Sequence, residues 1–138
     1  MDLWGIEPNP AARTRLVEDG ILPADRVIGG FGHKIPLADS AVEMAFTSGV
    51  LIHVDPSLLD QTMAEIHRVS SKYVFCAEYF SPKAETISYR GETDLLFKND
   101  FGSLYLDNFP DLQLVDYGFF WRRTTVMDDC TWWLFRKA

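Results

Sequence analysis

The sequence predicts an α/β protein with a Rossmann-like, mostly parallel sheet, helices on both faces and a C-terminal antiparallel hairpin. Three observations carry this prediction. Short apolar segments alternate with helical patterns in the first half of the chain, one continuous apolar run covers residues 72–80, and two aromatic-rich segments close the sequence. Alternating strands and helices are typical of parallel sheets, because each crossover helix returns the chain to the same end of the sheet.

The composition indicates one folded domain and argues against several partners. The 138 residues include 47% hydrophobic and 14% aromatic side chains, which is enough for one core. Thirteen Lys and Arg against 20 Asp and Glu give a net charge of −7, so no nucleic-acid partner is expected. No run has the length of a membrane span and no secretory signal is visible, so we expect a cytoplasmic protein without a membrane partner.

The cysteines and histidines do not have the spacing of a metal site. Cys76 and Cys130 are predicted to be reduced, packed thiols, and no metal is expected at His33, His53 or His67.

The N-terminal half is predicted to hold three strands and two helices. The first helix has Pro10 at a position that suits a helix start and Gly20 as a stop, and the second begins at Pro56 with helical spacing of its apolar residues. The strands are expected at residues 3–6, 26–28 and 42–46, and the helices at residues 11–18 and 56–69.

The second half is predicted to hold a buried strand, a short helix and a hairpin. The strands are expected at residues 72–80, 112–121 and 131–136, and the helix at residues 99–106. Residues 81–98 are read as a long connection with some extended structure. No internal repeat or domain boundary is visible, so residues 1–138 are expected to form a single domain.

Ligands of open α/β sheets bind outside the carboxyl ends of the strands. The residues expected at those ends form the candidate site. They are Glu7, the turn 29–33, Thr47, Ser48, Gly49, His53, Glu78 and Tyr79.

Short motifs in the same order resemble the class I S-adenosylmethionine-dependent methyltransferases. They are Gly5-Ile6-Glu7-Pro8-Asn9, the segment 35–40 and the segment 46–54. Further along, Ala77-Glu78-Tyr79, Tyr89-Arg90-Gly91 and the segments 96–101 and 114–118 are similar to methyltransferases associated with pseudaminic acid biosynthesis. The resemblance covers the chain from Leu3 onward.

The resemblance implies S-adenosylmethionine as cofactor. The residues that it assigns to cofactor binding are Glu7, Phe31, Gly32, Thr47, Ser48 and Gly49. Glu7 would accept hydrogen bonds from both ribose hydroxyls, although it also suits charge compensation at the start of the following helix. Residues 47–49 would line the cleft, or form an ordinary turn after a strand.

The substrate implied by the resemblance is a small, anionic, sugar-derived molecule of a nonulosonic acid pathway. His53 and Glu78 are the candidate acid/base residues, and each also suits a structural role as a packed or paired side chain. Tyr79, Arg90 and Lys98 are the candidate substrate-binding residues, with solvated loop charges as the alternative for the two cations.

The chain also departs from the family pattern. The family's first strand and glycine-rich loop are expected before Leu3 and are not seen, so we expect an N-terminally incomplete methyltransferase-like domain that lacks a βα unit. His33 or Lys34 stands where the family has an Asp for adenine. Unpaired strand edges favour a homodimer or strand-exchanged oligomer. The alternative function is a non-catalytic remnant or fragment that mediates self-association or partner binding.

Overall fold

The computed structural model describes the backbone of residues 1–138 and the side chains of all of them except Thr93 and Asp94. The strands are β1 (Gly5–Ile6), β2 (Val27–Ile28), β3 (Val42–Ser48), β4 (Ser70–Glu78), β5 (Glu85–Tyr89), β6 (Glu92–Lys98), β7 (Leu112–Phe120) and β8 (Cys130–Lys137). The helices are α1 (Pro10–Glu18), α2 (Pro56–Val69) and α3 (Phe101–Asn108), with single 3-10 turns η1 (Ala24–Arg26) and η2 (Leu51–His53).

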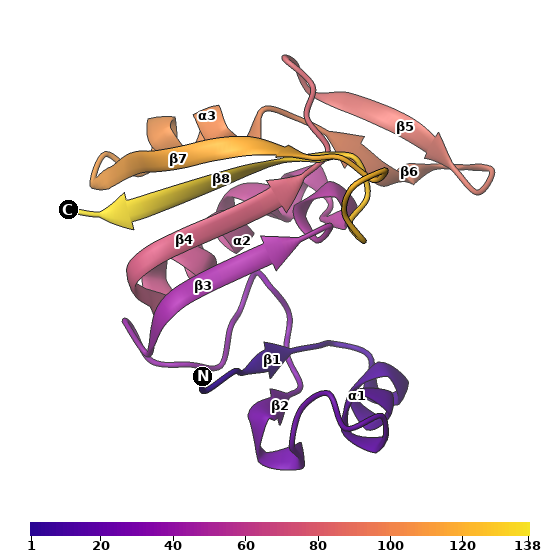
Figure 1. Cartoon of the computed structure of the whole chain (residues 1–138), viewed down its shortest axis with the longest axis vertical. Coiled ribbons are helices and arrows are strands. Elements are labelled where there is room, and N and C mark those ends of the chain that lie inside the picture. Colours follow the sequence, from indigo (N-terminus) through magenta and orange to yellow (C-terminus); the bar gives the residue numbers. More distant parts are fainter.

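The strands form three separate sheets rather than one (Figure 1). The largest has the order β3-β4-β8-β7, in which β3 and β4 are parallel and β8 is antiparallel to both of its neighbours. β1 pairs with β2 in parallel, and β5 pairs with β6 as an antiparallel hairpin. Three of the five strand pairs are therefore antiparallel, and the prediction of a mostly parallel sheet is wrong.

Helices cover only one face of the four-stranded sheet. Figure 1 shows α2 and α3 on its far side, and no described helix crosses the near side. There Met44 and Phe46 of β3 remain 46% and 53% exposed. The expectation of helices on both faces is wrong for this sheet because β7 and β8 are joined by a loop, which needs no crossover helix, and α1 packs with β2 instead.

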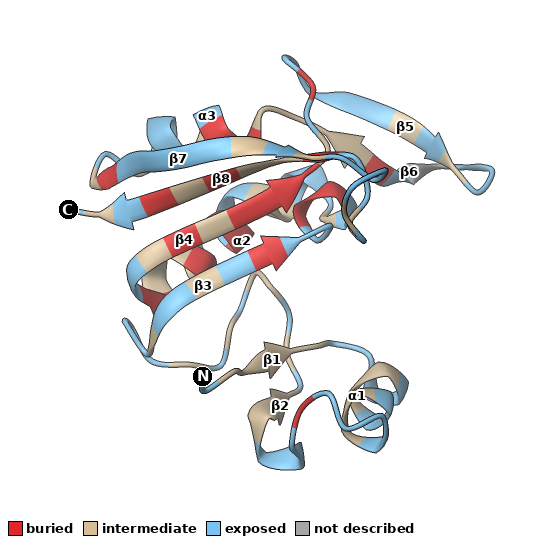
Figure 2. Ribbon diagram, viewed as in Figure 1, coloured by how far each residue is buried: buried red, intermediate tan, exposed pale blue. Residues whose placement is uncertain are grey.

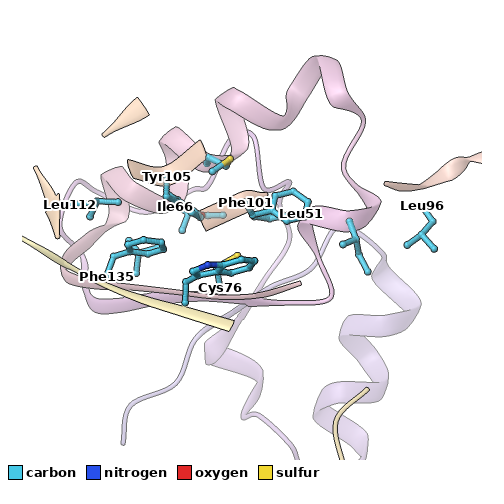
Figure 3. Close-up of a cluster of buried hydrophobic side chains, with 12 residues drawn as sticks. Leu51, Ile66, Cys76, Leu96, Phe101, Tyr105, Leu112 and Phe135 are labelled. Atoms are coloured by element: carbon cyan, nitrogen blue, oxygen red, sulfur yellow. The ribbon is translucent and has the colours of Figure 1, made fainter. Parts of the chain in front are cut away.

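The core lies between this sheet and the two helices (Figure 3). α2 contributes Met63 and Ile66, and α3 contributes Phe101 and Tyr105. Every second residue of β4 and β8 faces them, which gives the striped burial of these strands in Figure 2. The side chains that the two strands contribute to this core are Val74, Cys76, Trp133 and Phe135. Cys76 and Cys130 are free, buried thiols, as predicted.

The predicted connection at residues 81–98 contains a hairpin with a register shift between Ile87 and Tyr89. β5 and β6 pair from Glu85↔Lys98 to Tyr89↔Glu92. The turn between them uses positive φ at Arg90 (53°) and Gly91 (82°). Two successive positive φ values match the right-handed twist of paired strands, so Tyr89-Arg90-Gly91 is a hairpin signal that the prediction missed.

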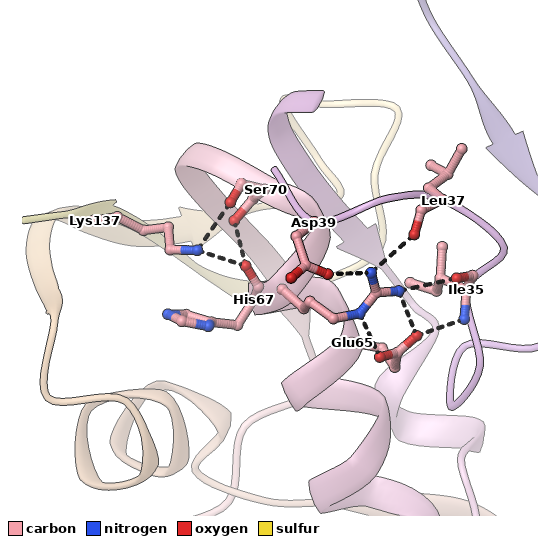
Figure 4. Close-up of polar contacts among 8 residues, drawn as sticks. Ile35, Leu37, Asp39, Glu65, His67, Ser70 and Lys137 are labelled. Carbon is pink, nitrogen blue, oxygen red and sulfur yellow. Dashed lines mark hydrogen bonds and ion pairs between the residues drawn. The ribbon is translucent and has the colours of Figure 1, made fainter. Parts of the chain in front are cut away.

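Arg68 is the centre of the contacts that tie residues 35–39, between β2 and β3, to α2 (Figure 4). Arg68 donates to the carbonyl oxygens of Ile35 (3.0 Å) and Leu37 (2.8 Å) and to the Asp39 carboxylate (2.8 Å). Glu65 accepts from Arg68 Nε at 2.7 Å and from the Ile35 N–H at 2.8 Å. The hydrogen bond to Glu65, followed by that to Asp39, raises the pKa of Arg68 above its usual range. The guanidinium therefore stays charged and holds the segment 35–39 on α2.

We expect Arg68→Met to release this segment from α2. Amide exchange at Ile35 should become about fivefold faster or more, because its acceptor Glu65 loses the partner that orients it, while the β4 amides stay protected. Hydrogen exchange followed by NMR measures both. Arg15→Met is the matched control, since Arg15 is exposed on α1 and makes no ion pair with a described residue. Unchanged amide exchange at Ile35 would contradict this role of Arg68.

Candidate functional site

The candidate residues follow the carboxyl ends of four strands. Glu7 follows β1, the turn 29–33 follows β2, Thr47 and Ser48 end β3, and Glu78 ends β4. Figure 1 shows β1 and β3 pointing the same way, so their carboxyl ends face the same side. No pairing joins β1 to β3, and the two sheets are linked through the segment that Arg68 holds. The predicted positions thus face the same side but belong to two separate sheets.

Glu7 is half-buried and supports the start of α1, while its ribose-binding role stays a prediction. One carboxylate oxygen accepts from the Asn9 N–H at 2.8 Å, and Asn9 in turn caps α1 by accepting from Ala11 N. Arg13 donates to the Glu7 carbonyl at 2.8 Å, which fixes the backbone. The second carboxylate oxygen makes no hydrogen bond to any side chain or backbone group that the structure describes. Glu7 therefore stabilises the helix start and still has an oxygen for a ligand.

The turn after β2 presents an exposed aromatic ring. Phe31 is 57% exposed and stacks on His33 with ring centroids 5.3 Å apart. Gly32 lies against α2, where a Cβ would come within 3.0 Å of the Thr62 methyl group. Gln61 donates to the His33 carbonyl at 3.0 Å and anchors the turn. The free face of Phe31 can stack on a planar ligand.

The end of β3 combines an unpaired hydroxyl with a glycine turn. The Thr47 hydroxyl is buried and has no hydrogen-bond partner among the described residues. Ser48 is exposed, and Gly49 has a φ of +63°, a conformation that favours glycine. The Gly49 N–H donates to the Ala77 carbonyl of β4 at 2.9 Å. These residues form the turn considered for them, and the Thr47 hydroxyl points into the buried side, toward Glu78 and Cys76.

Glu78 lies beneath this turn and is fully buried. Its two oxygens accept from the backbone N–H groups of Val50 and Ile52, each at 3.3 Å. Burial raises the pKa of Glu78 above its usual range, while these backbone donors act in the opposite direction. The carboxyl group holds η2 and has no exposed surface, which favours the structural alternative. Its catalytic role stays a prediction.

His53 is exposed and tied to the hairpin. Its Nδ1 lies 2.6 Å from the Leu95 carbonyl oxygen, and its ring is 5.7 Å from that of Tyr89. A carbonyl can only accept, so Nδ1 carries the proton and Nε2 of the neutral ring is left as the acceptor. The geometry suits proton acceptance at Nε2.

The three substrate-binding candidates are spread out. Tyr79 donates to the Asp128 carboxylate at 3.1 Å. Arg90 lies at the hairpin tip, with its guanidinium 5.1 Å from the Tyr89 ring centroid. Lys98 lies at the opposite end of the hairpin and lines a small cavity of about 120 Å3 beside η2. Arg90 and Lys98 therefore do not converge on one anion here.

Sequence reasoning missed the residues that hold the site together. Arg68 and Glu65 are three residues apart on α2, a spacing that brings side chains together, but nothing in the sequence links them to residues 35–39. Asp128 falls in the predicted polar loop, with no signal that pairs it with Tyr79. In the part of the chain that the structure describes, no group of His, Cys, Asp and Glu gathers as metal ligands. None of the described helices is both long and apolar enough to span a membrane.

Solved structures with this fold are S-adenosylmethionine-dependent methyltransferases and proteins related to them in fold. One is a methyltransferase from Methanosarcina mazei, with a TM-score of 0.73 and 14% identity over 97% of this chain and 81% of that one. Another is the Burkholderia thailandensis 1,6-didemethyltoxoflavin-N1-methyltransferase, with a TM-score of 0.75 and 13% identity over 99% of this chain and 61% of that one.

A third similar structure is the [4+2]-cyclase SpnF, with a TM-score of 0.65 and 14% identity over 100% of this chain and 66% of that one. No protein-family model and no curated protein matches the sequence. The chain spans about three fifths to four fifths of these three structures. The chain therefore has the class I methyltransferase fold. Identities this low establish the fold and no subfamily.

The raised pKa of Glu78 predicts that the free energy of unfolding depends on pH. A carboxyl group whose pKa is raised by folding stabilises the native state below its unfolded pKa, and this contribution is lost as the pH rises through the folded pKa. Relative to the wild type, Glu78→Gln should therefore gain stability between pH 4 and pH 8, by about 1.4 kcal/mol for each unit of pKa difference. Chemical denaturation across this range measures it, with exposed Glu18→Gln as control. A constant difference between variant and wild type contradicts the raised pKa.

Proposed function

We propose that the chain is an S-adenosylmethionine-dependent methyltransferase that acts on a small, anionic, sugar-derived substrate. The observation that carries the proposal is the set of free groups at the carboxyl ends of strands in a methyltransferase fold. These are the second Glu7 oxygen, the open face of Phe31 and the exposed Ser48. They fit a cofactor with ribose hydroxyls, a planar base and further polar groups.

Each residue has a distinct role in this proposal. Glu7 accepts from the ribose hydroxyls, Phe31 and Gly32 border the adenine, and residues 47–49 line the cleft. S-adenosylmethionine, when bound, supplies an electrophilic methyl group. Transfer then depends mainly on alignment of the acceptor, so residues that fix the cleft matter most. His53 Nε2 takes the proton where the acceptor is a hydroxyl or an ammonium group.

The substrate class rests on the motif resemblance and on two cations. Arg90 and Lys98 lie at the two ends of the β5–β6 hairpin, and neither forms an ion pair with a described carboxylate. In a protein of net charge −7, such free cations are the groups that can attract an anionic substrate. A pathway to nonulosonic acids is the source that the resemblance suggests. Binding by both cations requires movement of the hairpin.

A second candidate function is self-association without catalysis. Its support is the unpaired edge of β3 and the exposed Met44 and Phe46 on the face without helices. An unpaired, apolar edge strand is a template for another strand. A homodimer or a strand-exchanged oligomer covers this edge, and it also suits a methyltransferase whose cofactor pocket is impaired in a single chain. Cofactor binding distinguishes the two candidate functions, because only the methyltransferase requires it.

We expect S-adenosylhomocysteine to bind the purified chain, with Glu7→Ala weakening it about tenfold or more through loss of the ribose acceptor. Isothermal calorimetry measures both affinities, and Glu18→Ala on the exposed end of α1 is the control. No binding at millimolar ligand would favour the association module. Binding that Glu7→Ala leaves unchanged would remove Glu7 from the cofactor site.

The oligomer proposal has its own test. We expect the wild type to have the mass of a dimer or larger species at micromolar concentration, and Phe46→Lys to shift it to monomer because a charge at an edge opposes pairing. Light scattering after gel filtration measures the mass. Val126→Lys adds the same charge at a fully exposed loop position and should leave the mass unchanged. A wild-type monomer contradicts the proposal.

A further inference from the structure

A second hollow adjoins the end of β4, with Phe80 and Thr131 in its lining. It is a groove of about 500 Å3 between α3 and the β7–β8 hairpin, on the helix-covered side of the sheet. Phe80, Tyr117 and Trp133 line it with aromatic rings, and Leu106 and Leu114 add apolar edges. None of these residues has a role in the methyltransferase proposal, so the groove is a separate feature of the fold.

The three aromatic residues are neighbours with Trp133 in the middle. Trp133 is 7% exposed and forms the floor, while Tyr117 is its register partner on β7 and is 65% exposed. The Phe80 ring centroid lies 6.4 Å from that of Trp133, with the ring planes at 52°. Gly102 of α3 makes this possible, because a Cβ there would collide with Trp133 Nε1. The rings of Phe80 and Trp133 are thus tilted toward each other, and Tyr117 lines the same groove.

The charge in the groove is negative. Among the described residues that line it, Asp100 alone is charged. Its carboxylate is fixed at the start of α3, where it accepts from the Ser103 N–H at 3.0 Å and from the Ser103 hydroxyl at 2.7 Å. A carboxylate has about four acceptor positions, so these two bonds orient Asp100 and leave capacity for a ligand. An anion would find no positive side chain there.

We propose that this groove binds a small organic cation of the quaternary ammonium type. The faces of aromatic rings carry partial negative charge and attract such a cation within about 6 Å of the ring centroid. Asp100 adds a full negative charge at the rim, and the apolar lining suits the alkyl groups of the ligand. The inference does not depend on methyl transfer.

The test compares choline with 3,3-dimethylbutan-1-ol, in which carbon replaces the charged nitrogen and the shape is kept. We expect choline to bind at least about tenfold more tightly, at equal ionic strength, since the rings and the carboxylate recognise its charge. NMR titration of the indole N–H signals measures both affinities and reports on Trp133. Equal affinities, or no choline binding at 20 mM, the highest concentration tested, would overturn the proposal.

Two variants locate the site. Tyr117→Leu removes an exposed ring, and Asp100→Asn keeps a capping oxygen for α3 while removing the charge. Both should weaken choline binding by about threefold or more without changing the melting temperature. Tyr73→Leu on the opposite face and Asp107→Asn on α3 are the matched controls. Choline binding that the two groove variants leave unchanged, or a dimer that Tyr117→Leu dissociates without any choline binding, would assign the groove to another use.

Discussion

The contact between Arg68 and the segment 35–39 determines how the two halves of the molecule meet. β1 and β2 pair only with each other, so no strand hydrogen bond joins them to the main sheet. Arg68 and Glu65 connect α2 to the backbone that leads away from β2 (Figure 4). Glu7 and Phe31 lie on one side of this link and residues 47–49 on the other, so the link, together with the hydrogen bond from Gln61 to the His33 carbonyl, sets how the candidate residues are placed.

Carboxylates repeatedly fix backbone turns in this acidic chain. Glu65 accepts from Ile35 N–H, Glu78 from two N–H groups of the turn after β3, and Asp55 and Asp100 cap α2 and α3. Each bond satisfies a donor that would otherwise lack a partner. These carboxylates therefore stabilise the fold, and they fix the backbone next to the candidate site and the groove beside α3.

Local sequence patterns predicted several helices and strands well, but they did not predict contacts between residues far apart in the sequence. The helix predicted at residues 56–69 has those bounds, because Asp55, Pro56 and the apolar spacing are all local signals. The strand predicted at residues 72–80 begins two residues earlier and ends at Glu78. The layout of the sheets was not predictable from such patterns, since pairing and helix coverage depend on which edges meet in space. The candidate site shares this limit, as the pairing of Tyr79 with Asp128 illustrates.

The position of β8 affects when the main sheet can form during translation. β8 lies between β4 and β7, so these two strands do not pair with each other and each waits for residues 130–137. Lys137 then bonds to the carbonyls of His67 and Ser70, which closes the sheet onto the end of α2 (Figure 4). Until β8 emerges, one edge of β4 and the β8-facing edge of β7 have unpaired backbone N–H and C=O groups. During translation this stage is the one most in need of chaperone protection.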